Sequence, residues 1–595
     1  MTVFLGTCSG SIEFQKLKDG SMEPIIEFKD FTMKYRTQAE PTLHNINLKI
    51  FPGEKVLILG PSGSGKSTLA NCIDGLVPFT FAGTSTGECL VKGRPAKDLG
   101  IFELSKTVGT VLQDTDGQFL GLTVAEDIAF ALENDKAPQD EMFRRVREAA
   151  ETVDLVPFLR HAPGALSGGQ KQRVSMADVM VSNVDVLLFD EPLANLDPAT
   201  GKRAISLIDR IQKERGSTIV IIEHRLEDVL WRDVDRIVVI GEGCVVFDGT
   251  PDRLLAGNIL EEQGIREPLY ISALKYAGCT VKEEQHPQHI QTMDLASCKD
   301  KVRSWFTSVS LPEPPPKKEP VLEVRNLSYG YAPGEPVLKE IGFTINRGEM
   351  VSLVGRNGAG KTTLSSLICG FMEPDSGSIL LNGKDISPLS IKERGDHVGL
   401  VMQNPNQMIS KPMIFDEIAL GLRTRGIPEK EVKERVLDVL RICGLYPMRN
   451  WPVSALSFGQ KKRVTIASIL VLNPDVLILD EPTAGQDYRH YTEIMEFARK
   501  LNEEKGMTIL MITHDMHLML EYTNRALVLS EGRLLADDAP SRILTDDEIA
   551  DKAYLKRTSL YDLALKCGIN DAPSFVECFI YCDRVRRAEK GNNDS

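Results

Sequence analysis

Short apolar runs alternate with amphipathic stretches along most of the chain. Runs such as VLIL (56–59), VLLFD (186–190) and TIVII (218–222) have the length and the β-branched content of buried strands. Stretches with helical periodicity separate these runs. This alternation of strands and helices predicts an α/β fold.

The same pattern is present twice in the chain. The offset between the copies is 290 residues from Gln113 and Gln403 onward, whereas the two glycine-rich loops are 295 residues apart. The difference falls in the loop PFTFAGTSTGE (78–88), which makes the first copy longer. Two related α/β domains are therefore expected. The recurring motifs are GPSGSGKST (60–68) and GRNGAGKTT (355–363), LSGGQ (166–170) and LSFGQ (456–460), and LLFDEP (187–192) and LILDEP (477–482).

The repeat divides the chain into five parts. We place the first copy at 25–257 and the second at 321–545, with an N-terminal extension (1–24), an inter-domain segment (258–320) and a C-terminal helical extension with a tail (546–595). Local patterns add three expectations: a semi-rigid linker at LPEPPPKKEP (311–320), a short helix within GIREPLYISALKYAGC (264–279) and a frayed tail at VRRAEKGNNDS (585–595).

Each copy contains a glycine-rich loop between an apolar run and a helix. The spacing G-x-x-x-x-G-K-[ST] lets backbone N–H groups turn toward phosphate oxygens, and the helix N-terminus adds positive potential. Lys66 and Lys361 are expected to reach the β- and γ-phosphates, and Ser67 and Thr362 to ligate Mg²⁺. One match could be a chance glycine turn, but two in the same context favour nucleotide sites. The other expected nucleotide contacts are Gly60, Ser62, Gly63, Gly65 and Thr68, and Gly355, Asn357, Gly358, Gly360 and Thr363.

A pair of adjacent acidic residues ends a buried apolar run in each copy. Asp190 closes VLLFD and Asp480 closes VLILD, where a carboxylate is costly unless it meets a cation. We therefore expect both aspartates to hold Mg²⁺ through water. Glu191 and Glu481 follow directly and are expected to orient and deprotonate the attacking water.

A glutamine and a histidine recur in register with the acidic pairs. Gln113 and Gln403 are expected to contact Mg²⁺ and the attacking water, although a lone glutamine is usually a surface residue. His224 and His514 end the runs TIVIIEH and TILMITH. A single histidine at a strand end is more often structural, but the repetition favours a contact to the γ-phosphate.

An aromatic residue precedes each glycine-rich loop. Tyr35 lies 31 residues before Lys66, and Tyr331 lies 30 residues before Lys361. A tyrosine ring at this position could stack on adenine. The alternative is a tyrosine that belongs to the core of the domain.

Composition narrows the possible partners. The net charge of −14 disfavours nonspecific nucleic-acid binding, and no apolar stretch reaches the roughly 18–20 residues that cross a bilayer. The N-terminus lacks the pattern of a secretory signal. The eleven cysteines are scattered, and Cys578 and Cys582 come closest to a pair, so we expect reduced thiols of a cytosolic protein.

Together, these motifs resemble those of ATP-binding-cassette (ABC) ATPases, and the resemblance covers both copies. LSGGQ ahead of LLFDEP is specific to that family. The resemblance implies two P-loop ATPase domains, each with a mixed sheet and a helical subdomain, which bind ATP and Mg²⁺. It further implies a head-to-tail pairing in which the signature of one copy faces the glycine-rich loop of the other. The implied signature contacts are Ser457, Gly459 and Gln460 for the loop of the first copy, and Ser167, Gly169 and Gln170 for that of the second.

The two signatures are not identical. Phe458 replaces the glycine of the first signature, and a phenylalanine there is costly if its φ is positive. Ser457 and Gly459 remain. We expect ATP hydrolysis at both sites, and both equal and unequal rates are compatible with the two signatures.

A narrower resemblance is to the fused ATPases of energy-coupling-factor (ECF) importers of prokaryotes. VLQDTDGQFLGLTVAEDIAFALEN (111–134) and VMQNPNQMISKPMIFDEIALGL (401–422) carry it. This resemblance implies uptake of a vitamin, a vitamin precursor or a transition-metal ion. The implied partners are a transmembrane coupling subunit and a small-solute-binding membrane subunit, and the implied location is the cytoplasmic face of the membrane.

Other tandem ATPases remain as alternatives. One class of ribosome-associated twin ATPases has an N-terminal cysteine-rich motif, which 1–24 lacks, and another has a strongly charged helical linker, whereas 258–320 is mixed in charge. Tandem ATPases of sugar importers commonly have one degraded copy, but both glutamates and both histidines are present here. An exporter ATPase is disfavoured by the residues around the two glutamines.

Overall fold

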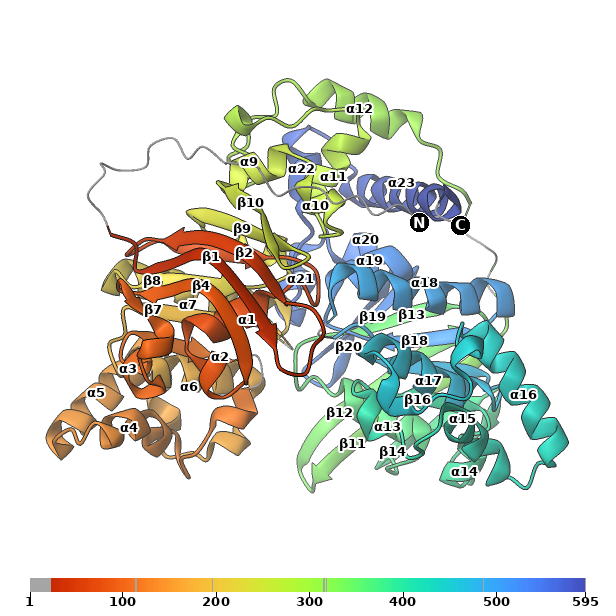
Figure 1. The fold of residues 1–595 in the computed structure, drawn as a ribbon. Coiled ribbons are helices and arrows are strands. Elements are labelled where there is room, and N and C mark those ends of the chain that lie inside the picture. Colours follow the sequence, from red (N-terminus) through yellow and green to blue (C-terminus); the bar gives the residue numbers. More distant parts are fainter. Residues whose placement is uncertain are drawn as a thin grey trace. The chain divides into compact units, whose positions relative to one another are not determined.

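The computed structural model describes residues 23–112, 115–194, 196–313, 316, 318–484 and 486–593, which form two compact units (Figure 1). Most of the predicted N-terminal extension and Gln113 lie outside these residues. Within them, no helix is long and apolar enough to cross a membrane. The first unit comprises the described residues up to Leu193, Arg203–Glu267 and Lys282–His289, and the second comprises Ala194–Lys202, Pro268–Val281 and the described residues from Ile290 onward.

The first copy is built on a six-stranded sheet with the strand order β10-β9-β3-β8-β7-β6. The strands from β9 to β6 are parallel, and β10 pairs with β9 in the antiparallel sense. Strands β3 and β8 are buried along their whole length, which explains the apolar runs VLIL and IVII that follow their first residues. A smaller antiparallel sheet has the order β2-β1-β4-β5. The bounds are β1 Ile26–Tyr35, β2 Leu43–Ile50, β3 Lys55–Leu59, β4 Gly83–Val91, β5 Arg94–Pro95, β6 Val108–Val111, β7 Val186–Asp190, β8 Thr218–Ile222, β9 Arg236–Gly241 and β10 Cys244–Gly249.

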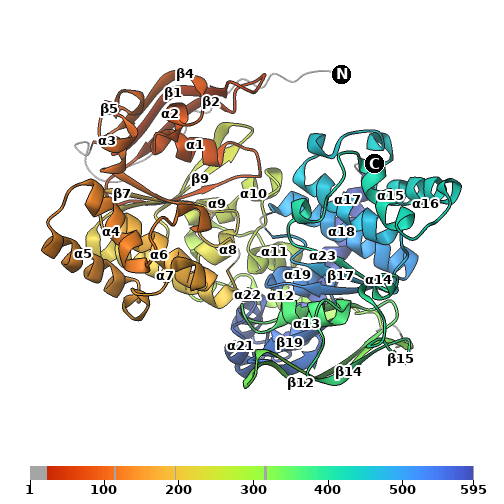
Figure 2. The same ribbon diagram turned by 90° about the horizontal axis from the view of Figure 1, so that it is seen from below.

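Three helices of this copy, α4, α5 and α6, pack against one another as a separate helical part (Figure 2). Helix α4 starts where Thr123 and Glu126 form a reciprocal capping box. The helix bounds are α1 Lys66–Ile73, α2 Leu76–Phe79, α3 Ile101–Ser105, α4 Val124–Asn134, α5 Gln139–Thr152, α6 Gly168–Met180, α7 Pro198–Arg215, α8 Leu226–Val229, α9 Pro251–Ala256 and α10 Ile259–Glu262.

The second copy repeats this architecture. Its sheets have the orders β16-β17-β18-β13-β19-β20 and β12-β11-β14-β15, and its helical part consists of α15, α16 and α17. The predicted fold class, two α/β domains with a mixed sheet and a helical part, is confirmed. The bounds are β11 Pro320–Ala332, β12 Glu335–Asn346, β13 Met350–Val354, β14 Ser376–Leu381, β15 Lys384–Asp385, β16 Val398–Val401, β17 Val476–Asp480, β18 Thr508–Ile512, β19 Arg525–Ser530, β20 Arg533–Asp538, α13 Lys361–Cys369, α14 Ile391–Arg394, α15 Ile414–Arg423, α16 Glu429–Ile442, α17 Phe458–Leu470, α18 Tyr488–Lys505, α19 Met516–Tyr522, α20 Pro540–Ile543 and α21 Asp547–Ala553.

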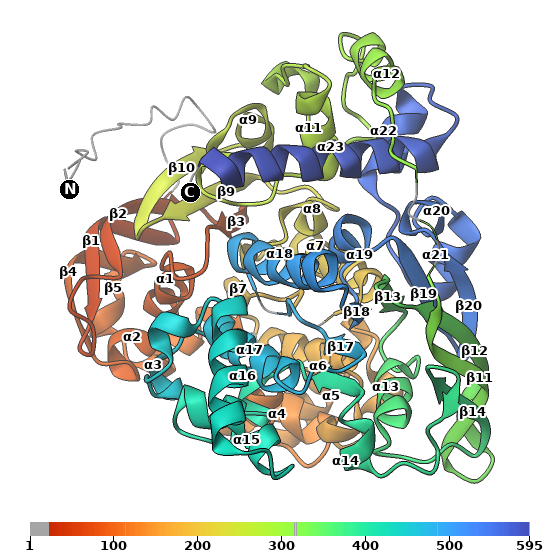
Figure 3. The ribbon, with the colours of Figure 1, turned by 90° about the vertical axis from the view of Figure 1, so that its right-hand side faces the viewer.

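The inter-domain segment and the C-terminal extension fold together. Helices α11 (Leu269–Tyr276) and α12 (Lys299–Ser308) pack with α22 (Ser559–Lys566) and α23 (Ala572–Asn593), and we call these four helices the helical module (Figure 3). The short helix expected within 264–279 is confirmed as α11. The expected frayed tail at 585–595 is wrong for the described part, because α23 continues to Asn593.

Aromatic residues form the centre of the helical module. Phe575 is fully buried, and its ring lies 5.9 Å from the Trp305 ring and 5.8 Å from the Phe306 ring, both in edge contacts. The Tyr276 ring stacks on Phe579 with a centroid distance of 5.4 Å. These contacts join segments that are more than 250 residues apart in the sequence.

Replacement of Phe575 by alanine tests this packing. We expect Phe575→Ala to destabilise the module by about 3–5 kcal/mol, because the change leaves a cavity among Trp305 and Phe306. Hydrogen exchange measured over α11, α22 and α23 should accelerate, while strands β3 and β13 stay protected. Tyr581→Ala on the more exposed side of the same helix is the control. Equal exchange in both variants would contradict the packing role of Phe575.

Candidate functional site

The glycine-rich loops connect β3 to α1 and β13 to α13. The first glycines, Gly60 and Gly355, have φ angles of 156° and 148°. A Cβ atom on Gly60 would lie 2.3 Å from the carbonyl oxygen of Ile240, and one on Gly355 would lie 2.2 Å from that of Leu529. Only glycine fits, because the loop passes directly against the end of the adjacent strand, β9 or β19.

The loop lysines fold back over their own loops. The Lys66 Nζ donates to the carbonyl oxygens of Gly60 (2.8 Å) and Pro61 (2.9 Å), and the Lys361 Nζ donates to those of Gly355 (2.8 Å) and Arg356 (3.1 Å). Burial lowers the pKa of Lys361, and the nearby carboxylates, including Glu481, oppose this shift. Each lysine is the first residue of its helix. A cation and a helix N-terminus thus meet at each loop, which suits phosphate binding.

Two of the predicted Mg²⁺ ligands of the first copy, Ser67 and Asp190, lie together. The Asp190 side chain accepts a hydrogen bond from Ser67, and burial, followed by the neighbouring Glu191, raises the pKa of Asp190 to about 6. The Asp190 Oδ1 atom is buried and has no hydrogen-bond partner among the described residues. A carboxylate oxygen of this kind beside a hydroxyl fits a hard cation such as Mg²⁺. In the second copy, burial and Glu481 raise the pKa of Asp480 to about 6 in the same way.

The glutamates that follow these aspartates have a strained backbone. The φ angles of Glu191 and Glu481 are 48° and 44°, a left-handed conformation that costs a non-glycine residue about 1–2 kcal/mol. The backbone N–H groups of Glu191 and Glu481 donate to the carbonyl oxygens of Ile222 and Ile512, both at 2.9 Å, and so fix the turn at the sheet edge. Strain that is retained in both copies at the same position is typical of functional sites.

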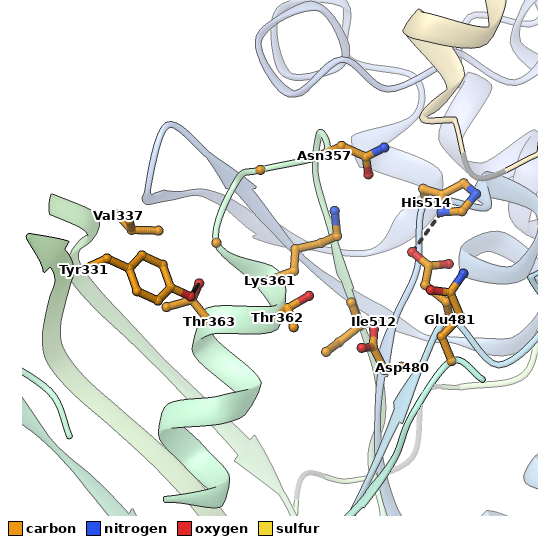
Figure 4. A pocket seen from close by; sticks show the side chains of 13 residues that line it. Tyr331, Val337, Asn357, Lys361, Thr362, Thr363, Asp480, Glu481, Ile512 and His514 are labelled. Atoms are coloured by element: carbon orange, nitrogen blue, oxygen red, sulfur yellow. Dashed lines mark hydrogen bonds and ion pairs between the residues drawn. The ribbon is translucent and has the colours of Figure 1, made fainter. Parts of the chain in front are cut away.

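Each of these glutamates faces the predicted histidine of its copy. The His514 Nδ1 lies 2.8 Å from the Glu481 Oε1 (Figure 4), and the His224 Nδ1 lies 3.8 Å from the Glu191 Oε1. The histidines follow β8 and β18, and the glutamates follow β7 and β17. Since β7 and β8, like β17 and β18, are adjacent parallel strands, their carboxyl ends bring the pairs together.

The two predicted tyrosines both reach the helix that follows the loop. The Tyr35 hydroxyl donates to the Thr68 hydroxyl at 3.1 Å, and the hydroxyls of Tyr331 and Thr363 are 3.0 Å apart. Tyr35 is half-buried and packs against the core, whereas 67% of Tyr331 is exposed. The Tyr331 ring is therefore free to meet a planar ligand.

A cavity of about 500 Å³ collects the predicted residues of the second copy (Figure 4). Apart from Val337 and Ile512, all of its lining residues belong to the set expected from the sequence. This volume and the mixed lining suit a nucleotide. We call this cavity, with its acidic pair and His514, site two, and the corresponding residues of the first copy site one. The predicted residues that line the cavity are Tyr331, Asn357, Gly358, Gly360, Lys361, Thr362, Thr363, Gln403, Asp480, Glu481 and His514.

The signature residues begin the helices α6 and α17. Ser457 caps α17, and the Gln460 side chain accepts from the Ser457 N–H at 3.0 Å; the Gln170 side chain accepts from the Ser167 N–H at 2.8 Å. Both glutamines thus serve in capping boxes. Phe458 lies inside α17 without a positive φ, so the strain anticipated for this residue is absent.

Two buried residues near the sites were missed from the sequence. Glu223 is fully buried beside His224, with its Oε1 3.4 Å from the His224 Nδ1. The corresponding residue of the second copy is Thr513. Lys462 is fully buried, and its Nζ donates to the carbonyl oxygens of Met402 (2.6 Å) and Gln403 (2.9 Å). Two differences between the copies could have revealed these residues from the sequence. The first copy has EH (223–224) where the second has TH (513–514), and KQR (171–173) where the second has KKR (461–463).

Comparison with known proteins matches both copies and the segment between them. The family model described as ABC transporter matches residues 43–194 and 338–484, and the model described as ATP-binding cassette cobalt transporter matches residues 257–329. A protein of Clostridium perfringens (strain 13 / Type A), provisionally named an ABC transporter ATP-binding protein, is 59% identical over 95% of this chain and 99% of its own length. A relative with the same provisional name from Enterococcus faecalis (strain ATCC 700802 / V583) is 56% identical over 95% and 99%.

A solved structure also matches part of the chain. It is described as cbiO1 from Clostridium perfringens, part of the ABC transporter complex cbiONQ. It is 35% identical, covers 42% of this chain and 100% of its own chain, and has a TM-score of 0.38.

Substitution of Tyr331 tests whether its exposed ring contacts the base of a nucleotide. We expect Tyr331→Ala to weaken ATP binding at site two about fivefold, because a stacked aromatic ring contributes about 0.5–1.5 kcal/mol. Tyr331→Phe, which keeps the ring and loses only the hydroxyl, should bind within about twofold of the parent chain. The measurement is the binding of a fluorescent ATP analogue to chains that also carry Lys66→Ala, which abolishes binding at site one. Equal affinity of the alanine and phenylalanine variants would contradict stacking.

Proposed function

The chain belongs to the ABC transporter family and hydrolyses ATP, and from this premise we propose that it is the ATPase of an ECF-type importer of prokaryotes. The proposed cargo is a vitamin, a vitamin precursor or a transition-metal ion. The match of residues 257–329 to a model described as a cobalt transporter carries the proposal, together with the complete sets of site residues in both copies.

In the proposed reaction, both copies perform the same chemistry. Lys361 holds the β- and γ-phosphates, and the Thr362 hydroxyl and Asp480 hold Mg²⁺, which neutralises charge on the phosphates. Glu481 accepts the proton of the attacking water, and His514 contacts the γ-phosphate. In site one, these roles belong to Lys66, Ser67, Asp190, Glu191 and His224. The further contacts are Gln113 in site one and Gln403 in site two.

The 2.8 Å contact between His514 and Glu481 supports these roles. It keeps the histidine and the proposed base together at one edge of the sheet. The strained φ of Glu481 turns its side chain out of the strand direction and toward the cavity. A base that is already oriented loses less entropy during the reaction.

An exposed apolar surface in the first copy is the proposed dock for the transmembrane coupling subunit. Leu120, Leu122 and Phe143 are 68%, 83% and 68% exposed, and Phe130 is 44% exposed. They lie in the loop before α4 and on the paired helices α4 and α5. Several strongly exposed apolar side chains in one short stretch of the chain are typical of a protein interface. The chain would then lie at the cytoplasmic face of the membrane, with a second, solute-binding subunit in the complex.

Single substitutions of the proposed bases test the chemistry. Glu191→Gln and Glu481→Gln should each lower ATP turnover and leave a measurable remainder, because both sites are proposed to hydrolyse ATP. Steady-state phosphate release measures this. Full activity in one variant with none in the other would contradict two working sites.

Affinity purification from gently solubilised membranes tests the importer assignment. Mass spectrometry should identify a polytopic coupling protein and a small solute-binding membrane protein with the tagged chain. Leu122→Glu should reduce this recovery, because a charge would enter the apolar interface. Leu565→Glu, at an exposed position of α22, is the matched control. Recovery of ribosomal proteins without membrane proteins would overturn the assignment.

A further inference from the structure

The C-terminal helix α23 binds the helix that follows His514. The Arg587 guanidinium donates to the Glu521 carboxylate at 2.9 Å and to the Tyr522 hydroxyl at 3.1 Å. The Arg584 Nε donates to the carbonyl oxygen of Glu521 at 2.8 Å. Glu521 and Tyr522 are the last residues of α19, and Glu521 is only 3% exposed. The position of α19 therefore depends on two arginines of α23.

Arg587 also reaches the helix that follows Glu481. Its guanidinium lies 5.7 Å from the centroid of the Tyr488 ring, and Tyr488 is the first residue of α18. The Tyr488 ring stacks on Tyr491, whose ring makes an edge contact with Tyr522. Arg587 thus contacts two helices at once, and α18 and α19 are the next helices in the chain after Glu481 and His514.

A second contact joins the C-terminal extension to the glycine-rich loop of site two. The Arg356 guanidinium of that loop lies 5.6 Å from the Tyr554 ring centroid. Tyr554 directly follows α21 and has a φ of 58°. The backbone nearby is fixed, because the Ser530 hydroxyl donates to the carbonyl oxygen of Lys552 at 2.7 Å. The extension therefore touches segments adjoining three parts of site two.

The first copy lacks the residues for these contacts. In register, Trp231 and Arg232 stand at the positions of Glu521 and Tyr522, and Pro198 stands at that of Tyr488. The glycine-rich loop has Pro61 in place of Arg356. The first copy therefore has no carboxylate at the position of Glu521 and no ring at the position of Tyr488.

The inter-domain segment shares a partner with Arg587. Asp583 accepts from the Tyr276 hydroxyl with its Oδ1 (2.6 Å) and pairs with Arg587 through its Oδ2 (2.5 Å). The Arg586 guanidinium lies 4.1 Å from the centroid of the Tyr276 ring on α11. A chain of direct contacts thus runs from α11 through Asp583 and Arg587 to Glu521.

We infer that Arg587 is a positioning residue for site two, through which the helical module controls the rate of ATP hydrolysis in the second copy only. Arg587 is not among the residues that line the cavity of site two, and it acts by holding α18 and α19 in position. The inference rests on the proposed roles of Glu481 and His514. Removal of Arg587 would leave the buried Glu521 carboxylate without its main cation, so α19 would shift toward water.

Turnover in single-site backgrounds tests this role. Site two is isolated by Glu191→Gln and site one by Glu481→Gln. We expect Arg587→Gln to lower kcat at site two about tenfold, with KM for ATP within about twofold, since a small misplacement of catalytic groups slows chemistry more than binding. Site one should keep its rate. Arg587→Lys should restore part of the rate, and Arg557→Gln, which removes an exposed ion pair with Asp547, should change nothing.

Hydrogen exchange and a second variant separate positioning from loss of folding. Exchange should rise in α19 and at the start of α18, while β17 and β18 stay protected. If Arg587→Gln unfolds the module, Glu521→Gln tests the positioning role instead. This variant keeps the size of the side chain and one hydrogen-bond acceptor for Arg587. It should still slow ATP turnover at site two at least about twofold.

The failures of the two proposals are distinguishable. Unchanged site-two turnover in folded Arg587→Gln, or in Glu521→Gln, would overturn the positioning role and leave the site assignment intact. Equal slowing of both sites would also overturn it. Unimpaired site-two turnover in Glu481→Gln would instead overturn the assignment of the base, and the positioning role with it.

Discussion

The close passage of each glycine-rich loop against the adjacent strand is the constraint on which both sites depend. Gly60 and Gly355 let the loop approach a carbonyl oxygen where no Cβ fits. A helix begins at the lysine of each loop, and the N–H groups of its first turn lie at the carboxyl edge of a parallel sheet. The acidic pairs and the histidines follow neighbouring strands of that sheet, so the same edge brings the lysine, the acidic pair and the histidine of each copy together. The family's ATP hydrolysis follows from this one arrangement, present twice.

The two sites differ less in their own residues than in what surrounds them. Glu223 faces His224 in the first copy, where Thr513 stands in the second. Lys462 holds the backbone at Gln403, where the first copy has Gln172. The helical module contacts helices that adjoin site two. A tandem chain allows such divergence, because each copy can acquire its own supporting contacts while both loops keep one geometry.

The site residues that could be predicted are those that belong to short sequence motifs with a fixed spacing. Lys361, Asp480, Glu481 and His514 line one cavity because each ends or begins a strand or helix that the pattern of the sequence indicates. Arg587 could not be found in this way. Its partner Glu521 lies 66 residues away, and the polar sequence VRRAEKGNNDS has the composition of a frayed end. Arg587 contacts α18 and α19, which lie far away in the sequence, and a local pattern does not reveal such contacts. For Phe458, the sequence suggested a strain that the structure does not have. That strain required a positive φ, and Phe458, the first residue of α17, does not have one.

The stoichiometry of nucleotide binding tests most directly the central claim that one chain contains two complete ATP sites. Calorimetric titration of ATP with Mg²⁺ into the Glu191→Gln/Glu481→Gln double variant, which should bind without hydrolysis, is the measurement. The account predicts two ATP molecules per chain, and one per chain after Lys66→Ala is added. Binding of a single ATP by the double variant itself would contradict it.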